Sequence, residues 1–284
     1  MSHDPFDFTP APDRYAVMGN PVGHSRSPRI HTLFAEQTGQ HMSYEAVQVD
    51  IGGLAQAIGN FQASGGHGLN ITVPFKEKAF ELADQLSERA RLAEAVNTLT
   101  FDAAGLRGDN TDGQGLVTDL RDNLEWPLEG VRILLVGAGG AARGVIGPLL
   151  EAGPAELRLV NRTPDRAREL AGHFRALGPI RGGGLESADT PFDIIINATA
   201  ASLEGQVPEL NPAVVGPETA VYDMMYAAEP TAFVQWGVAR GAHAVADGLG
   251  MLVEQAAESF TLWRGVRPKT GPVLTTLRRE LEAV

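Results

Sequence analysis

The chain has 284 residues, and its 23 Lys and Arg against 35 Asp and Glu give a formal net charge of −12 at pH 7. The 43% of hydrophobic residues can fill one large core or two ordinary ones, which argues against global disorder. The acidic balance argues against non-specific nucleic-acid binding, and the absence of cysteine excludes disulfides, thiolate catalysis and cysteine-ligated metals.

The N-terminal segment Met1–Pro10 has neither the basic stretch nor the apolar run of a secretory leader. No stretch of the sequence approaches the ~20 apolar residues that a membrane-spanning helix needs. We therefore expect a soluble, globular, cytoplasmic protein with no membrane partner.

Short β-branched runs alternate with amphipathic stretches along the first part of the chain, which is typical of an α/β fold. Ser27 followed by Pro28 suits the start of a helix, with the serine as N-cap and the proline in the first turn. The predicted strands cover residues 15–18, 44–49, 69–73 and 97–101, and the predicted helices cover 28–38, 53–64, 75–82 and 88–95.

A break at residues 126–130 separates this part from a second alternating set. We predict two α/β domains, 1–112 and 113–247, with the C-terminal segment 248–284 returning to the first domain. The second set has predicted strands at 131–136, 156–160, 193–197, 220–223 and 243–246, helices that begin near Ala141, Pro164 and Thr231, and C-terminal helices at 251–264 and 273–282.

A glycine-rich loop, Gly137-Ala138-Gly139-Gly140-Ala141-Ala142, follows the strand at 131–136 directly and opens a helix. It fits the G-x-G-x-x-A pattern of a dinucleotide site. The first glycine allows a tight turn, and the second lets the backbone approach a pyrophosphate at the positive end of the helix dipole. Glycine-rich loops are also ordinary turns, but the strand before this one and the helix after it favour a Rossmann-type domain.

The end of the next strand indicates which dinucleotide binds. NAD enzymes usually carry an acidic residue there, whereas this chain has Asn161-Arg162-Thr163, with Arg166 one turn further on. The positive start of a helix is a poor place for cations unless an anion binds there. Since Arg162 and Arg166 could clamp a 2′-phosphate, with Thr163 adding a hydroxyl, we predict NADP(H) as cofactor rather than NAD(H).

Only Lys76, Lys78 and Lys269 are lysines among the 23 basic residues. A lysine can release a proton, whereas arginine stays protonated at any accessible pH. For Lys78 and Lys269 we prefer chance retention on a solvated helix. Lys76 lies at the start of a predicted helix, a place that the helix dipole makes unfavourable for a cation without another role.

Lys76 belongs to one of several polar segments that have no evident structural purpose. Together these segments offer many neutral donors and acceptors, one amine and carboxylates, which suits a polyhydroxylated small molecule. The segments are Gly19–Pro28, Asn70–Lys76, Ala95–Thr98 and Gly108–Gly113.

These segments closely resemble the shikimate dehydrogenase family, and the resemblance runs nearly from end to end. It implies a two-domain fold with the C-terminal helices packed on an N-terminal substrate domain. The matching motifs are Gly19-Asn20-Pro21 through His24-Ser25-Arg26-Ser27-Pro28, Asn70 through Lys76, Ala95-Val96-Asn97-Thr98, Gly108 through Gly113, Gly137 through Ala142, Asn161-Arg162-Thr163, Tyr222-Asp223-Met224 and Asp247 through Leu252.

The resemblance also implies roles for individual residues. Ser25 and Ser27 match positions that bind the substrate carboxylate, and Lys76 and Asp112 match the pair at the reacting hydroxyl. The full substrate set is Ser25, Ser27, Thr72, Lys76, Asn97, Asp112, Tyr226 and Gln255. The implied cofactor set is Glu88, Gly137, Ala138, Gly139, Gly140, Ala141, Asn161, Arg162, Thr163, Arg166, Met224 and Gly248. One departure is visible, because Ala200 and Ala201 stand where the family often has Ser and Gly.

The chemistry of a hydride-transfer site explains why a lysine and a carboxylate are needed. Reduction of a ketone builds negative charge on its oxygen, which a neighbouring cation stabilises and a neighbouring acid protonates. We assign the proton to Lys76 and orientation of the lysine and the hydroxyl to Asp112. For Asp112, a role as a turn or cap residue remains a competing interpretation.

No metal site is predicted. His24 and His31 lack the spacing of metal ligands and are interpreted as packing or polar-loop residues. Asp109, Asp119 and Asp122 are interpreted as turn and solvated helix residues.

The expected activity is the reversible NADP-dependent reduction of 3-dehydroshikimate to shikimate in aromatic amino-acid biosynthesis. An alternative is a quinate dehydrogenase, or an enzyme that acts on both substrates. A non-catalytic ligand-sensing homologue should have degraded positions 76 and 112, and this chain does not. The expected partner is the small-molecule substrate alone, bound by a monomer or homodimer.

Overall fold

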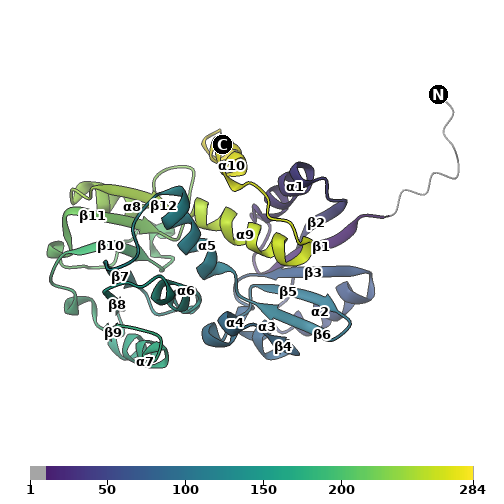
Figure 1. Cartoon of the computed structure of the whole chain (residues 1–284), viewed down its shortest axis with the longest axis horizontal. Coiled ribbons are helices and arrows are strands. Elements are labelled where there is room, and N and C mark those ends of the chain that lie inside the picture. The colour runs from purple at the N-terminus through teal and green to yellow at the C-terminus, as the bar shows by residue number, and fades with distance from the viewer. Residues whose placement is uncertain (1–10, 284) are drawn as a thin grey trace, which may run out of the picture.

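The computed structural model describes residues 11–283, and the segment Met1–Pro10, on which the leader prediction rests, lies outside them. Two six-stranded sheets lie at opposite ends of the molecule, with helices α5 (Asp112–Thr118) and α9 (Leu249–Arg264) between them (Figure 1). This arrangement confirms the predicted α/β class with two sheets.

The first sheet has the strand order β2-β1-β3-β5-β6-β4. β1, β2 and β3 run parallel, whereas β5 is antiparallel to both β3 and β6. Its strands are β1 (Asp13–Gly19), β2 (Met42–Gln48), β3 (Gly66–Ile71), β4 (Gln85–Leu86), β5 (Thr98–Asp102) and β6 (Gly105–Asp109). Its helices are α1 (Ser27–Thr38), α2 (Leu54–Ala63), α3 (Lys76–Leu82) and α4 (Glu88–Ala93).

The second sheet is wholly parallel in the order β12-β11-β10-β7-β8-β9, which is the arrangement of a Rossmann-type domain. Its strands are β7 (Arg132–Val136), β8 (Glu156–Val160), β9 (Ile180–Gly183), β10 (Phe192–Asn197), β11 (Val215–Asp223) and β12 (Ala244–Asp247). Its helices are α6 (Gly140–Glu151), α7 (Pro164–Phe174) and α8 (Ala232–Ala239), with 3₁₀ turns at Leu185–Ser187, Ala201–Glu204 and Pro212–Val214.

The C-terminal helices return to the first sheet, as the sequence predicts. α9 and α10 (Thr270–Glu282) bury apolar side chains against α1, including Phe260 and Leu277 against Phe34. α9 also packs along α5, which continues into a π-helical turn at Asp119–Asn123. The segment 248–283 therefore connects the two parts of the fold through one helix that contacts both.

Three short strands were not predicted, namely β4, β6 and β9. The polar segment Gly108–Gly113, whose Asp109 was interpreted as a turn residue, is not one continuous turn, because β6 runs through Asp109 and α5 begins at Asp112. Gly108 is a strand residue without room for a side chain, since a Cβ there would lie 2.7 Å from Val96 Cγ2. Close approach, not turn formation, requires this glycine.

The start of α1 also differs from the prediction. The helix begins at Ser27 itself, and the Ser27 amide donates a hydrogen bond to Ser25 Oγ at 3.2 Å. The hydroxyl at the helix start is thus that of Ser25, and the Ser27 hydroxyl is not used to cap α1. Within residues 11–283, no helix is long and apolar enough to cross a membrane.

Candidate active site

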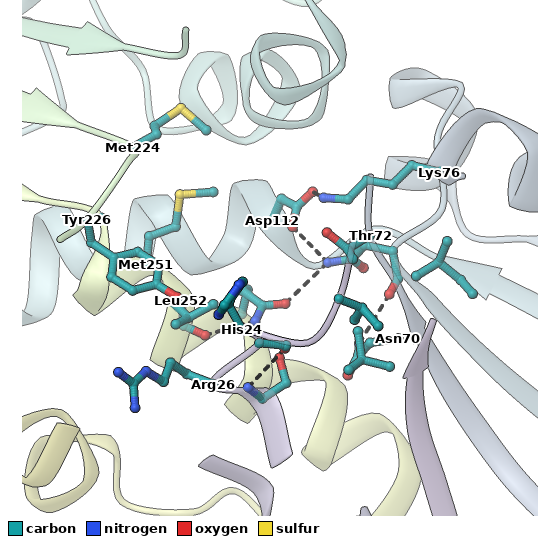
Figure 2. A pocket seen from close by; sticks show the side chains of 18 of the residues that line it. His24, Arg26, Asn70, Thr72, Lys76, Asp112, Met224, Tyr226, Met251 and Leu252 are labelled. Atoms are coloured by element: carbon teal, nitrogen blue, oxygen red, sulfur yellow. Dashed lines mark hydrogen bonds and ion pairs between the residues drawn. The ribbon is translucent and has the colours of Figure 1, made fainter. Parts of the chain in front are cut away.

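A cavity of about 340 Å³ opens between the two parts of the fold (Figure 2). Three loops of the first sheet line it, following β1, following β3 and joining β6 to α5, and the second part adds residues that follow β11 and β12. All eight residues of the predicted substrate set line the cavity: Ser25, Ser27, Thr72, Lys76, Asn97, Asp112, Tyr226 and Gln255. Met224 and Gly248, predicted as cofactor contacts, line it as well.

Lys76 and Asp112 form an ion pair inside this cavity. Each is the first residue of its helix, Lys76 of α3 and Asp112 of α5, and Lys76 Nζ donates to Asp112 Oδ2 at 2.6 Å. The two side chains keep 26% and 12% of their surface exposed, so solvent and a small ligand can reach them. The pair therefore presents a positive group and an acceptor together at one end of the cavity.

Neighbouring amides fix the orientation of the Asp112 carboxylate. Asn97 Nδ2 donates to Asp112 Oδ1 at 2.8 Å, and the Asp112 amide donates to Asn110 Oδ1 at 3.1 Å. Asn97 Nδ2 also lies 3.3 Å from Gln255 Oε1 on α9, which ties the network to the C-terminal helix. The N-cap residue of α5 is Thr111, so the structure does not support Asp112 as a cap.

A second polar layer lies beneath this pair, and two of its members, Tyr44 and Ser259, were missed by sequence reasoning. Tyr44 donates to Asn70 Oδ1 at 2.7 Å, and Asn70 Nδ2 donates to Ser259 Oγ and to Thr98 Oγ1, each at 3.1 Å. The Thr98 hydroxyl donates in turn to Asn97 Oδ1 at 2.8 Å. Ser259 lies one turn after Gln255 on α9, and this four-residue spacing from a predicted site residue is the sequence signal that could have indicated it.

His31 lies next to Tyr44, in the buried part of this polar layer. It is fully buried, its ring stacks on Tyr44 with centroids 4.1 Å apart, and neither ring nitrogen has a hydrogen-bond partner within residues 11–283. Burial lowers the pKa of His31 from 6.5 to about 3, so the ring is neutral at pH 7. The interpretation of His31 as a packing residue is confirmed.

The lowered pKa of His31 predicts a loss of stability in acid. In the unfolded chain the His31 ring is protonated below about pH 6.5, whereas in the folded chain it is protonated only below about pH 3. The free energy of unfolding therefore falls as the pH falls through this window. His31→Phe keeps the stacking and removes the titration. The difference in free energy of unfolding between His31→Phe and wild type should shift in favour of the variant by about 2 kcal/mol from pH 7 to pH 5, measured by urea unfolding. The control is His41→Asn, at an exposed position, which should lose as much stability in acid as wild type does. If His31→Phe loses as much stability between pH 7 and pH 5 as wild type, the prediction is contradicted.

The glycine loop of the second part has the geometry of a pyrophosphate site. Gly137 has φ +109°, which favours glycine, and its amide donates to the Val160 carbonyl at 2.8 Å. A Cβ on Gly139 or Gly140 would meet nothing within 4 Å, so open space faces the first turn of α6. Backbone amides at the start of this twelve-residue helix can therefore receive a phosphate.

A second cavity, of about 450 Å³, extends from this loop. Gly137, Asn161 and Arg162 line it, together with Thr199 from the loop after β10. Thr163 is the N-cap residue of α7, and Arg166 is exposed on the first turns of that helix. In the described range 11–283, neither Arg162 nor Arg166 has a carboxylate within 4 Å, so both cations can serve an anionic ligand. These residues fit a dinucleotide that carries a 2′-phosphate.

Asn197 holds the loop that carries the two alanine departures. Its Nδ2 donates to Asp223 Oδ1 at 2.9 Å and its Oδ1 accepts from the Thr199 amide and hydroxyl. These side-chain contacts hold residues 197–199, which lead into Ala200 and Ala201, and the carbonyls of the two alanines accept backbone hydrogen bonds from Leu203 and Gln206.

Glu88, which is also in the predicted cofactor set, lies on a different part of the fold from the glycine loop and the start of α7. It is exposed in the first turn of α4, in the substrate part, and it lines neither of the two cavities.

The interpretation of Asp109 and Asp119 as turn and solvated residues was wrong. Burial alone would raise the pKa of Asp109, but the hydrogen bonds and charge of Arg89 outweigh it and hold the pKa below its usual value. Burial raises the pKa of Asp119, which accepts a hydrogen bond from Tyr222 at 2.7 Å. Asp122 is exposed as predicted, beside Arg121.

Comparisons with known proteins show which family this chain is similar to. Residues 17–99 match the model described as shikimate dehydrogenase substrate binding domain, residues 120–205 match shikimate / quinate 5-dehydrogenase, and residues 248–278 match the shikimate 5′-dehydrogenase C-terminal domain. A curated relative from Nitrosococcus oceani, named shikimate dehydrogenase (NADP(+)), is 54% identical over 273 residues, which cover 95% of this chain and 97% of the relative.

Solved structures share the whole architecture. The shikimate 5-dehydrogenase of Thermus thermophilus, in complex with NADP(H) and shikimate, has a TM-score of 0.86 at 36% identity and covers 95% of this chain and 100% of its own. A 5-ketofructose reductase of a Gluconobacter strain has a TM-score of 0.84 at 28% identity and covers 95% of this chain and 99% of its own. Given the 54% identity to a named relative across nearly the full length, the chain belongs to the shikimate dehydrogenase family.

Proposed function

We propose that the protein catalyses the reversible, NADP-dependent reduction of 3-dehydroshikimate to shikimate, a step of aromatic amino-acid biosynthesis. The observation that carries this proposal is the Lys76–Asp112 pair, 2.6 Å apart, in a cavity that Ser25 and Ser27 also line. The name of the Nitrosococcus relative and the ligands of the Thermus structure support the same substrate and cofactor. The intact pair also speaks against a non-catalytic ligand sensor.

The substrate is held along the length of the cavity. Its carboxylate is proposed to bind Ser25 and Ser27 at the start of α1, where the helix dipole favours an anion. Its hydroxyls are proposed to bind the neutral polar side chains of the cavity wall, which are Thr72, Asn97, Tyr226 and Gln255. This pose directs the reacting oxygen to Lys76 and Asp112.

The chemistry at that oxygen follows from the ion pair. When bound, NADPH supplies the hydride to the carbonyl carbon. The oxygen gains negative charge, which the Lys76 ammonium stabilises, and Lys76 Nζ then donates the proton. Asp112, fixed by Asn97, holds the ammonium in place and accepts a hydrogen bond from the product hydroxyl. The reverse reaction uses the same groups in the opposite order.

The cofactor is proposed to bind on the second part of the fold. Gly137, Ala138, Gly139, Gly140 and Ala141 would receive the pyrophosphate, and Asn161, Arg162, Thr163 and Arg166 would receive the adenosine end with its 2′-phosphate. Met224 and Gly248, which line the main cavity, would contact the nicotinamide end. Residues 1–112 with 248–284 are thus the proposed substrate domain, and 113–247 the proposed cofactor domain. The cytoplasmic location and the monomeric or homodimeric state stay predictions.

One steady-state experiment tests the proposal. Oxidation of shikimate and of quinate is measured with NADP⁺ and with NAD⁺, following the reduced nicotinamide at its absorbance maximum. We expect kcat/KM for shikimate with NADP⁺ to exceed that for quinate by on the order of 10²-fold, because quinate has an additional tertiary hydroxyl and a saturated ring carbon. Equal values for the two acids would make the protein a dual enzyme, and no oxidation of either would refute the proposal.

A further inference from the structure

We propose that Arg26 is a charge-selecting residue, which makes this site prefer a polyhydroxylated substrate with a carboxylate over a neutral one. The inference rests on the proposed function and adds to it a determinant of substrate class. It follows from the position of Arg26, from the charges around the cavity and from a comparison with a related fold.

Arg26 stands between the two serines of the proposed carboxylate site. It lines the cavity, directly before the first residue of α1. Figure 2 shows Arg26 and Tyr226 at one side of the pocket and the Lys76–Asp112 pair at the opposite side. A substrate whose reacting oxygen lies at Lys76 therefore has its far end near Arg26.

Arg26 also carries the uncompensated charge of the cavity. The ionised side chains that line it are Lys76, Asp112 and Arg26, and the first two neutralise each other at 2.6 Å. No carboxylate of residues 11–283 lies within 4 Å of the Arg26 guanidinium. Arg29, one turn along α1, is by contrast paired with Glu280 at 2.8 Å. A free cation is the feature that attracts an anion into a protein with net charge −12.

The charge of Arg26 acts on Tyr226, which belongs to the other part of the fold. Burial raises the pKa of Tyr226, and the charge of Arg26 opposes this shift. The charge of Asp247 raises this pKa as well. Arg26 and Tyr226 lie on the same side of the cavity, at the end where the substrate carboxylate is proposed to bind.

The fold itself does not require an anionic substrate. The Gluconobacter relative has the same architecture at a TM-score of 0.84 and is a 5-ketofructose reductase, and 5-ketofructose carries no carboxylate. Selection for the acid must therefore come from side chains, and Arg26, which lines the same cavity as Ser25 and Ser27, supplies a positive charge suited to it.

The test compares shikimate with its methyl ester, which keeps the ring and hydroxyls and loses the negative charge. kcat/KM is measured for both compounds with NADP⁺ at low and high NaCl in wild type, Arg26→Gln, Arg26→Lys and Arg29→Gln. Arg26→Gln should lower kcat/KM for shikimate about tenfold, through KM, and should reduce its salt dependence. The value for the ester should change by less than about twofold.

The controls separate charge from structure. Arg26→Lys should restore most of the preference for the acid, and Arg29→Gln, which removes a cation outside the cavity, should behave as wild type. An equal loss on acid and ester in Arg26→Gln, or no loss on either, would overturn the role of Arg26 while leaving the proposed function intact. If wild type fails to oxidise shikimate, the proposed function itself is refuted.

Discussion

Lys76→Ala is expected to lower kcat by about 10³-fold, because the variant loses both the cation at the developing oxyanion and the proton donor. Binding of NADPH should stay within about twofold of wild type, since Lys76 belongs to α3 and the cofactor loop to the other sheet. The measurements are steady-state rates with shikimate and titration of NADPH fluorescence. Retention of a rate within about tenfold of wild type would remove Lys76 from the mechanism.

Two further variants separate the roles of this lysine. Lys78→Ala is the matched control, because Lys78 lies two residues further in the same helix, is exposed and pairs with Glu81. It should keep the wild-type rate. Lys76→Arg keeps the positive charge beside Asp112 but cannot release a proton, so substrate binding should survive while turnover remains low. A rate near wild type in Lys76→Arg would show that charge, and not proton transfer, is the contribution of position 76.

The sequence patterns predicted the long elements well, because each has a clear apolar period. β7 with the glycine loop and α6 follow the prediction closely, and so does α7 after Pro164. β4 has two residues and β9 contains two glycines, so neither shows an apolar alternation that could reveal it. These strands are defined by pairing with β6 and β8, which is tertiary information.

The grouping of the site residues also follows from strand directions. The loops after β1 and β3 lie at one edge of the first sheet because these strands are parallel, and they carry Ser25 and Lys76. β5 is antiparallel to β3, so Asn97 before its first residue lies at that same edge, and Asp112 after β6 does so as well. Motif spacing identified these residues, whereas the antiparallel pairing that brings Asn97 to Asp112 could not be deduced from it.

Buried polar residues outside the recognised motifs were the class that sequence reasoning could not place. Asp119 and Ser259 have the spacing of ordinary helix residues, yet one accepts from buried Tyr222 and the other from Asn70. Their partners lie more than a hundred positions away in the chain. Only the packing of α5 and α9 between the sheets reveals these contacts.

Arg162→Asp is expected to produce the second large effect, on cofactor choice. Arg162 lies after β8 beside the second cavity, exposed and with no carboxylate within 4 Å among residues 11–283. Aspartate there would repel a 2′-phosphate and could accept hydrogen bonds from a free ribose 2′-hydroxyl. We expect KM for NADPH to rise about 100-fold and the ratio of kcat/KM for NADPH over NADH to fall at least as much.

The rate at saturating NADPH separates binding from chemistry in this variant. It should stay near wild type, because the Lys76–Asp112 pair lies in the other cavity. Arg240→Asp makes the same change of charge at an exposed position that ends α8, and it should leave both cofactors unaffected. The two variants have equal net charge. If KM for NADPH rises as much in Arg240→Asp as in Arg162→Asp, the cause is the net charge of the protein and not a contact of Arg162. An unchanged KM in Arg162→Asp would instead leave Arg166 and Thr163 as the groups that recognise the phosphate, since they flank the same helix start.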